Sequence, residues 1–270
     1  MNEEAQERGL NIAAVVPTIG RVETLPLTLN SIVEQDYPVD KLFLIDEADT
    51  TVLESYAVNQ ILDLMSHDGI EIHIIRNRWP SGIGAARVLA GELAGDDACL
   101  MLDDDVAMRS GCLAYLVEAL KEVSSANWAT PYCYLIGGRG MDGYIDTEVS
   151  PTDPKVQEWT SRYPFFIPYY DYGPDNKVIY PVAGTQAILF RRGNDIPEKA
   201  KNASYIGKMP REDTYITLVT GPGVHTSNAH CIHIEHPNQI GRNSWGETSF
   251  YRLHEAVIKD PETWVTLFRK

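Results

Sequence analysis

The chain has 270 residues, of which 44% are hydrophobic and 23% charged, so it can bury a sizeable core and is neither disordered nor low in complexity. Its formal net charge of −15 argues against a protein that coats nucleic acid with a broad basic face, although a local basic groove stays compatible with it. Four scattered cysteines without Cys-x-x-Cys spacing, and the lack of an apolar targeting or membrane-spanning run, predict a cytoplasmic protein without a zinc site or a disulfide framework.

The first half of the sequence alternates between two kinds of pattern. Four short runs rich in Val, Ile and Leu have the length and composition of buried strands: 12–17, 41–46, 70–75 and 98–103. The segments between them repeat apolar residues at helical spacing: 25–35, 52–65 and 82–94. Strand–helix–strand units of about 30 residues predict a right-handed, mostly parallel α/β sheet.

The second half has a different composition. From about residue 126 to 181 the chain is rich in Tyr, Pro, Gly and Asp with weak periodicity, which predicts irregular structure that faces a substrate. Strands are predicted at 180–192 and 229–236, and helices at 210–221 and 249–258. Several large aromatic residues serve either as stacking surfaces for a ligand or as core: Trp79, Trp128, Tyr132, Tyr134 and Trp245.

Polar residues follow three of the predicted strands. The sequences are PTIGR after the first strand, DEAD after the second, and Asp103-Asp104-Asp105 after the fourth. Because open α/β sheets bind ligands at the carboxyl ends of their strands, we expect these groups to converge on one site. Two carboxylates about 4 Å apart repel by about 1 kcal/mol in water and about 4 kcal/mol at an effective dielectric constant near 20. We therefore expect a positive charge beside the three aspartates.

Common phosphate-binding patterns fit the sequence poorly. Residues 46–49 spell a helicase signature, but the only Gly-Lys pair, Gly207-Lys208, lacks the earlier glycine and the hydroxyl of a phosphate-binding loop. Arg87 stands where a dinucleotide-binding fingerprint requires its third glycine, which argues against a NAD site. Neither a His-Glu-x-x-His nor a Gly-x-Ser-x-Gly motif occurs.

Seven segments follow one another in an order and at a spacing typical of one enzyme family. They are VVPTIGRVETLPLTLNSIVEQDYP, LFLIDEAD, RNRWPSGIGAARVLAGELA, LMLDDDV, VAGTQAILFRR, REDTYITL and AHCIHIEH. Through them the chain, from about residue 11 to 255, resembles the family 2 glycosyltransferases of the GT-A fold. The resemblance implies an α/β fold with a Rossmann-like, mostly parallel central sheet flanked by helices, and a smaller acceptor-side region.

The resemblance also implies a division of the chain. We expect a polar tail at 1–10, a nucleotide-sugar-binding α/β half at 11–125, an acceptor-binding and catalytic half of the same domain at 126–255, and a C-terminal tail at 256–270.

In this family a divalent cation bridges the donor diphosphate to carboxylate oxygens, which implies Mn²⁺ or Mg²⁺ here. If the strand persists, Asp103 and Asp105 project to one side and share the cation, whereas Asp104 turns towards the ribose or the backbone. The implied third ligand is His233, with His236 as the alternative. A solvated acidic turn and a hydrogen-bonded strand histidine are the purely structural alternatives.

The Glu212-Asp213 pair forms a second carboxylate centre. The resemblance assigns Asp213 the role of the base that deprotonates the acceptor hydroxyl, and Glu212 that of orienting the acceptor. Direct displacement then inverts the anomeric configuration. Acidic residues in the first turn of a helix can instead complement the helix dipole.

Donor binding is implied for residues that follow the early strands. They are Pro17, Thr18, Arg21 and Glu23 for the base and ribose, Asp46 for a base N–H, Arg87 for the diphosphate, and Asp103 and Asp104 beside the cation. The sequence departs from the family where DEAD replaces DDGS and PTIGR replaces PTYNR, which leaves the nucleotide base open. A plain salt-bridge role stays an alternative for each charged residue.

The function that these implications define is metal-dependent, inverting transfer of a sugar from a nucleotide-diphosphate donor, preferably a UDP-sugar, to an acceptor hydroxyl. Two alternatives are a sugar-1-phosphate nucleotidyltransferase and a non-catalytic binder of sugar nucleotides or glycans. The sequence does not identify the acceptor, for which a glycan, a lipid-linked intermediate, a natural product and a modified nucleobase are the alternatives. It does not identify the oligomeric state either.

Overall fold

The computed structural model of the chain describes residues 9–76, 83–136, 177–180, 187–196, 216–217 and 220–234. The contacts between residues divide the chain into two compact units. The first comprises residues 1–137 and 172–234, and the second comprises 138–171 and 235–270. All of the described residues belong to the first unit.

The alternating elements predicted for the first half are confirmed, with ends shifted by one or two residues, except that the helix predicted at 52–65 begins at Tyr56 after a short 3₁₀ turn. The strands are β1 (Ile12–Thr18), β2 (Lys41–Asp46), β3 (Glu71–Arg76) and β4 (Ala98–Leu102). The helices between them are α2 (Leu25–Val33), α3 (Tyr56–His67) and α4 (Ile83–Ala94), with a short 3₁₀ turn, η1 (Val52–Glu54), before α3.

Local sequence signals explain where the helices begin. Pro26 stands in the first turn of α2, where a missing N–H costs nothing. The Ser55 side chain accepts a hydrogen bond from the backbone N–H of Val58 and caps α3. The chain leaves α3 through Gly69, whose φ of 87° lies in the left-handed region that glycine adopts most easily.

The second half contains more regular structure than its composition predicts. Its elements are β5 (Val106–Met108), α5 (Cys112–Glu122), β6 (Trp128–Ile136), β7 (Lys177–Tyr180), β8 (Ala187–Phe190) and β9 (Gly223–Ile234). The prediction of irregular structure from about 126 to 181 is wrong for β6 and β7. Pro131 and the following register shift interrupt the periodicity of β6, yet its neighbours β8 and β9 complete its hydrogen bonds.

The predicted later elements are found in part. The strand predicted at 180–192 corresponds to β8 and to Tyr180 at the end of β7, and the strand at 229–236 is the end of β9. Ile216, Thr217 and Thr220 are helical, as predicted for 210–221. The rest of that helix and the helix predicted at 249–258 lie outside the described residues.

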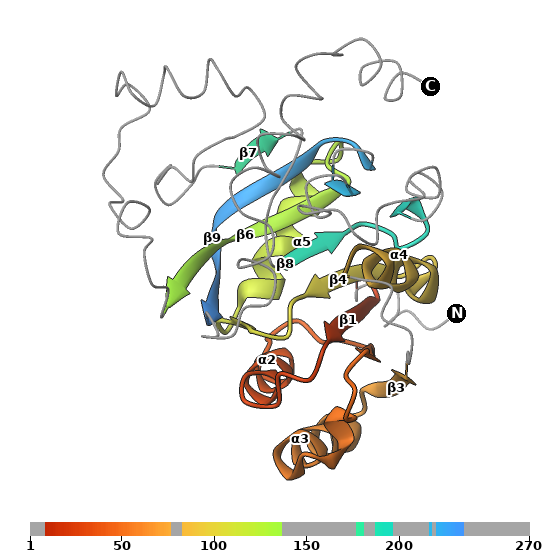
Figure 1. Cartoon of the computed structure of the whole chain (residues 1–270). Helices are drawn as coiled ribbons and strands as arrows, with labels where there is room; N and C mark the ends of the chain where they lie inside the picture. Colours follow the sequence, from red (N-terminus) through yellow and green to blue (C-terminus); the bar gives the residue numbers. More distant parts are fainter. Residues whose placement is uncertain are drawn as a thin grey trace, which may run out of the picture. The chain divides into compact units, whose positions relative to one another are not determined.

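One sheet of nine strands connects the described elements, in the order β3-β2-β1-β4-β8-β6-β9-β5, with β7 pairing beside β9 (Figure 1). Pairing is parallel among β1 to β4 and between β6 and β9, and antiparallel where β8, β5 and β7 join. Six strands therefore run in one direction, which confirms a mixed α/β fold with a mostly parallel sheet. The ends of β1, β2, β4 and β9 consequently lie at the same edge.

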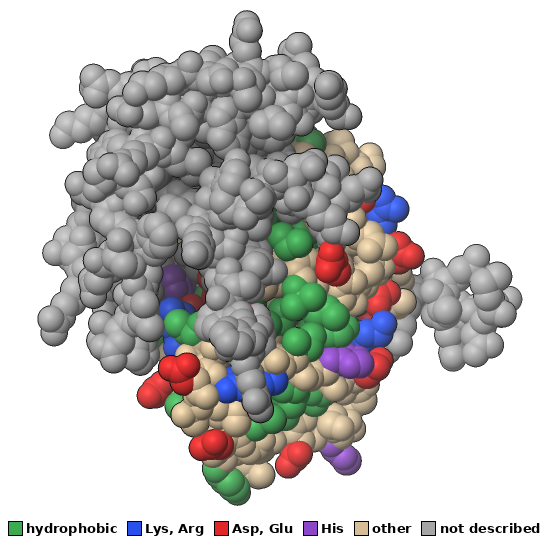
Figure 2. All heavy atoms as spheres, turned by 45° about the vertical axis from the view of Figure 1, so that its right-hand side comes forward, with side chains coloured by type: hydrophobic (Ala, Val, Ile, Leu, Met, Phe, Trp, Pro, Cys, Tyr) green, Lys and Arg blue, Asp and Glu red, His purple; other side chains and the backbone are tan. Residues whose placement is uncertain are grey.

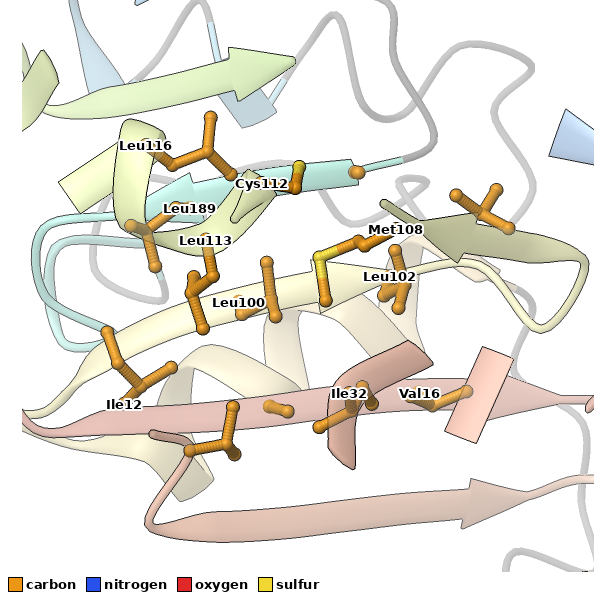
Figure 3. Packing of buried hydrophobic residues seen from close by; sticks show 14 of the residues in the cluster. Ile12, Val16, Ile32, Leu100, Leu102, Met108, Cys112, Leu113, Leu116 and Leu189 are labelled. Carbon is orange, nitrogen blue, oxygen red and sulfur yellow. The ribbon is translucent and has the colours of Figure 1, made fainter. Parts of the chain in front are cut away.

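Alternating residues of the strands build the core. Ile12 and Val16 of β1, Leu100 and Leu102 of β4, and Leu189 of β8 pack with α2 and α5 on one face of the sheet (Figure 3). The opposite face is also buried, because α4 packs on β1, β2 and β4. Strands that are buried on both faces account for the continuous apolar runs in the sequence.

The described part of the chain holds no membrane-spanning helix, and the face that Figure 2 shows carries charges of both signs. None of its helices combines the length and the apolar composition that are needed to cross a bilayer. On the part of the surface that Figure 2 shows, Lys and Arg side chains are interspersed with Asp and Glu rather than gathered.

Trp128 belongs to the core and does not offer a stacking surface. Its side chain is fully buried, and its Nε1–H donates to the carbonyl oxygen of Gly221 at 2.7 Å. A Cβ on Gly223 would lie 1.9 Å from Cδ2 of Trp128, far inside van der Waals contact. The glycine therefore makes room for the indole.

Replacing Gly223 with Ala should destabilise the protein by about 3 kcal/mol or more, at the upper end of the overpacking range, as measured by chemical denaturation. Gly69→Ala is the matched control, since a Cβ there meets nothing within 4 Å and only the positive φ opposes it. We expect that control to cost about 1 kcal/mol. An unchanged free energy of unfolding in Gly223→Ala would contradict this packing.

Candidate active site

The three aspartates form a turn rather than the end of a strand. β4 ends at Leu102, and Asp103–Asp105 carry the chain over to β5. The turn is closed by a hydrogen bond from the N–H of Val106 to the carbonyl oxygen of Asp103, and the N–H of Ile234 binds the carbonyl oxygen of Asp105. Because the strand does not continue through these residues, strand alternation does not place Asp103 and Asp105 on the same side. The side chains of Asp104 and Asp105 are buried, and that of Asp103 is 17% exposed.

Two arginines supply the positive charge expected beside these carboxylates. Nη1 of Arg21 lies 2.7 Å from Oδ1 of Asp104 and 2.6 Å from Oδ2 of Asp105. Nη2 of Arg87, itself buried, lies 2.5 Å from Oδ1 of Asp103. The Thr18 hydroxyl donates to the other oxygen of Asp104 at 2.7 Å. Strand ends β1 and β4 and helix α4 thus meet at the acidic turn, as the sheet edge predicts.

Burial sets the electrostatics of this cluster. It raises the pKa of Asp104 to about 6, against the lowering effects of Arg21 and of the Thr18 hydrogen bond. Burial also lowers the pKa of the Arg21 guanidinium, but Asp104 and Asp105 raise that pKa by more. Arg21 is therefore charged, and its charge compensates the two buried carboxylates together.

His233 reaches the same turn from β9. It pairs in register with Val106 of β5, and its Nε2 lies 3.3 Å from Oδ1 of Asp105. Burial lowers the pKa of His233, but the negative charge of the neighbouring Asp105 carboxylate raises that pKa above its ordinary value. Oδ1 of Asp105 and Nδ1 of His233 are buried and accept or donate no hydrogen bond among the described residues.

These two residues fit a divalent cation as a nitrogen and an oxygen ligand, whereas Asp103 is held apart by Arg87. Within the described ranges, no three side chains of His, Cys, Asp or Glu are close enough together to hold a metal ion. The predicted alternative ligand, His236, lies outside these ranges.

The Asp46 carboxylate is hydrogen-bonded to the loop that follows β2. It is fully buried, and its oxygens accept hydrogen bonds from the N–H of Ala48 at 3.0 Å, the hydroxyl of Thr51 at 2.7 Å and the N–H of Val52 at 3.1 Å. Nη1 of Arg76 lies 2.9 Å from Oδ1 of the same carboxylate. In this conformation Asp46 has no exposed oxygen for a nucleotide base, so the predicted contact requires the loop to open.

The other predicted donor-binding residues vary in exposure. Pro17 is half-buried, Thr18 is buried and Glu23 is exposed on the loop that follows β1. Glu212 and Asp213, the predicted catalytic pair, lie outside the described residues.

Two contacts were not predicted from the sequence. Arg21 binds Asp104 and Asp105 directly, and Arg76 binds Asp46. The second had a signal, because Asp46 and Arg76 are register partners at the ends of the adjacent parallel strands β2 and β3. Arg21 lies 83 positions before Asp104 and 84 before Asp105, and no pattern in the sequence pointed to these contacts.

Solved structures of glycosyltransferases share this fold. GalNAc-T7 with UDP, GalNAc and Mn²⁺ has a TM-score of 0.60 and 16% identity over 86% of this chain and 45% of that one. The S. aureus TarS 1-349 complex with UDP-GlcNAc has a TM-score of 0.56 and 14% identity over 85% of this chain and 60% of that one. The mannosyltransferase PcManGT from Pyrobaculum calidifontis, in complex with GDP-Man and Mn²⁺, has a TM-score of 0.54 and 17% identity over 88% of this chain and 60% of that one.

At these identities the likeness establishes the fold, which is the GT-A fold of glycosyltransferases. The chain spans between 45% and 60% of the length of these three structures. No curated protein sequence matches the chain. The family model for glycosyl transferase family 2 matches residues 13–192, more than half of the chain. The chain therefore belongs to glycosyl transferase family 2.

Proposed function

We propose that the protein is a metal-dependent, inverting glycosyltransferase that moves a sugar from a nucleotide-diphosphate donor to an acceptor hydroxyl. The observation that carries the proposal is the convergence of Thr18, Arg21, Arg87 and His233 on the aspartate turn at the carboxyl edge of a GT-A sheet. Ligands bind at this edge in open α/β sheets.

The proposed roles follow from the chemistry of each group. Asp105 and His233, joined by Asp103 once Arg87 releases it, are the ligands of Mn²⁺ or Mg²⁺. When bound, the cation supplies positive charge that stabilises the departing diphosphate. Arg87, whose planar guanidinium matches phosphate oxygens, is the proposed diphosphate contact, and Asp104 with Thr18 lines the ribose side.

The proposed base is Asp213, with Glu212 orienting the acceptor. A carboxylate that takes the acceptor proton as the hydroxyl attacks the anomeric carbon gives inversion in one displacement. An α-linked donor would then yield a β-glycoside. The support for these two residues is their place in the family pattern.

The donor class is proposed from the molecules bound in the similar structures. These are UDP with GalNAc, UDP-GlcNAc and GDP-Man, so both UDP- and GDP-sugars are donors to test, with UDP-sugars first. The four cysteines are free, which is compatible with the proposed cytoplasmic location. The acceptor is proposed only as a hydroxyl group.

Turnover with candidate donors separates this function from its alternatives. Incubation with UDP-sugars or GDP-mannose and Mn²⁺ should release the nucleoside diphosphate, and chelator should stop the release. Release of pyrophosphate would instead identify a nucleotidyltransferase. Binding of donor without any product would identify a non-catalytic binder.

Donor binding should also be visible as stabilisation. With Mn²⁺ present, the nucleoside diphosphate of the true donor at about 100 times its Kd should stabilise the fold by about 2.7 kcal/mol, which a thermal unfolding assay detects. Addition of EDTA should remove the shift. A nucleotide shift of the same size with and without chelator would contradict metal-dependent binding.

A further inference from the structure

The Arg21 side chain occupies an unusual position between two buried carboxylates. A single nitrogen, Nη1, contacts Asp104 at 2.7 Å and Asp105 at 2.6 Å. The two carboxylates are only 5% and 2% exposed, so water cannot screen their repulsion. Arg21 therefore acts as the counter-ion of both, a role that a divalent cation can also fill.

The backbone of Arg21 is fixed while its side chain is accessible. Its carbonyl oxygen accepts hydrogen bonds from the N–H of Thr24 at 3.2 Å and of Leu25 at 2.9 Å, at the start of α2. Its side chain is 22% exposed, in contrast to the two aspartates that it contacts. The guanidinium can thus leave the turn by rotation of its side chain, without disturbing the helix.

Asp105 is shared between two kinds of partner. Its Oδ2 contacts Arg21, and its Oδ1 faces Nε2 of His233 at 3.3 Å without accepting a hydrogen bond from the described residues. A divalent cation bound to Asp105 would lie beside the guanidinium, and like charges at such short range repel strongly. Arg21 and the cation therefore compete for the same carboxylate.

We propose that Arg21 is a latch, which holds Asp104 and Asp105 in the donor-free protein and must release Asp105 before a divalent cation binds there. The proposal rests on the proposed metal-dependent function. It makes Arg21 a positioning residue that weakens cation binding until its guanidinium leaves the turn. By the same argument, removing the guanidinium should tighten binding of the cation alone.

Titration of the full chain with Mn²⁺ alone, followed by the electron paramagnetic resonance signal of the free ion, tests this directly. We expect Arg21→Gln to lower the Kd for Mn²⁺ at least tenfold relative to the wild type. Arg21→Met, which keeps a long side chain without the charge, provides a second test if the Gln variant does not fold. Circular dichroism and thermal unfolding establish that each variant is folded.

Two control variants separate the latch from general charge effects. Arg21→Lys keeps a cation in reach of both carboxylates, so its Kd should stay within about threefold of the wild-type value. Arg76→Gln removes the same charge from the same sheet edge, beside Asp46 and about three strand spacings from the turn, roughly 14 Å away. We expect its Kd for Mn²⁺ to change less than twofold, because screening is substantial over this distance.

An unchanged or weaker affinity in folded Arg21→Gln and Arg21→Met would overturn the latch, as would equal tightening in Arg76→Gln. The absence of Mn²⁺ binding in all variants would overturn it as well. The transferase proposal is judged separately, by release of nucleoside diphosphate from the donor. A wild type that transfers sugar while Arg21→Gln fails to bind Mn²⁺ more tightly would retain the function and reject the latch.

Discussion

Replacing Asp105 with Ala is expected to abolish turnover and the metal-dependent part of donor binding. The side chain is 2% exposed and faces His233 through one oxygen and Arg21 through the other. Loss of metal stabilisation of the leaving diphosphate removes several kcal/mol, and about 4 kcal/mol corresponds to about 10³-fold in kcat. Steady-state kinetics with Mn²⁺ and isothermal titration with donor measure the two effects.

Asp97→Asn is the matched control for Asp105. Asp97 also carries a charge paired with a basic residue, Lys41, at 3.0 Å, but it precedes β4, at the opposite end of that strand from the turn. A partly exposed ion pair of this kind contributes about 1 kcal/mol or less to stability. Turnover of Asp97→Asn should stay within about twofold of the wild type. Loss of activity in both variants together would point to a general folding defect rather than a lost metal ligand.

Replacing Asp213 with Asn is expected to lower kcat by about 10² or more while the Kd of the donor stays nearly constant. The amide keeps the size of the side chain and removes its ability to accept the acceptor proton. Pre-steady-state or steady-state kinetics, together with donor titration, separate the two parameters.

Glu212→Gln provides the comparison for this second prediction. If Glu212 orients the acceptor, its variant should raise the KM for the acceptor more than it lowers kcat. Turnover of Asp213→Asn at the wild-type rate would reject Asp213 as the base, and a helix-dipole role for the pair would then remain.

The sequence was most informative where the chain is buried on both sides. The runs that became β1, β2 and β4 are largely apolar because both faces of the sheet are buried there, so composition alone predicts them. β6 was missed for the opposite reason. Its Pro131, its bulge and its aromatic residues break the alternation, and its hydrogen bonds come from β8 and β9, more than 50 residues later in the chain.

No element was predicted over 106–125, where the structure has β5 and α5. The three residues of β5 are too few to produce a pattern, and their position beside β9 depends on pairing with a distant strand. The buried residues of α5 do recur at helical spacing, at Leu113, Leu116, Val117 and Leu120. That helix was predictable from the sequence.

The candidate site, like the fold, was predictable only in part. Convergence of the strand ends was predictable, because parallel strands place their carboxyl ends at one edge. The partner of each charged side chain was not predictable. Arg21 could bind any nearby carboxylate, and the turn of Asp103–Asp105 depends on where β4 ends. The prediction that Asp103 and Asp105 share one side assumed that the strand continues. In the structure Asp103 instead contacts Arg87, whereas Asp105 contacts Arg21 and His233.

Anomalous diffraction at the manganese edge, from crystals soaked in Mn²⁺ and the nucleoside diphosphate, examines the central idea of a cation held at the aspartate turn. We predict one strong anomalous peak in contact with Asp105 and His233, with the diphosphate on its other side. Nucleotide bound elsewhere on the sheet, or bound at this edge with no anomalous peak beside the turn, would contradict the account.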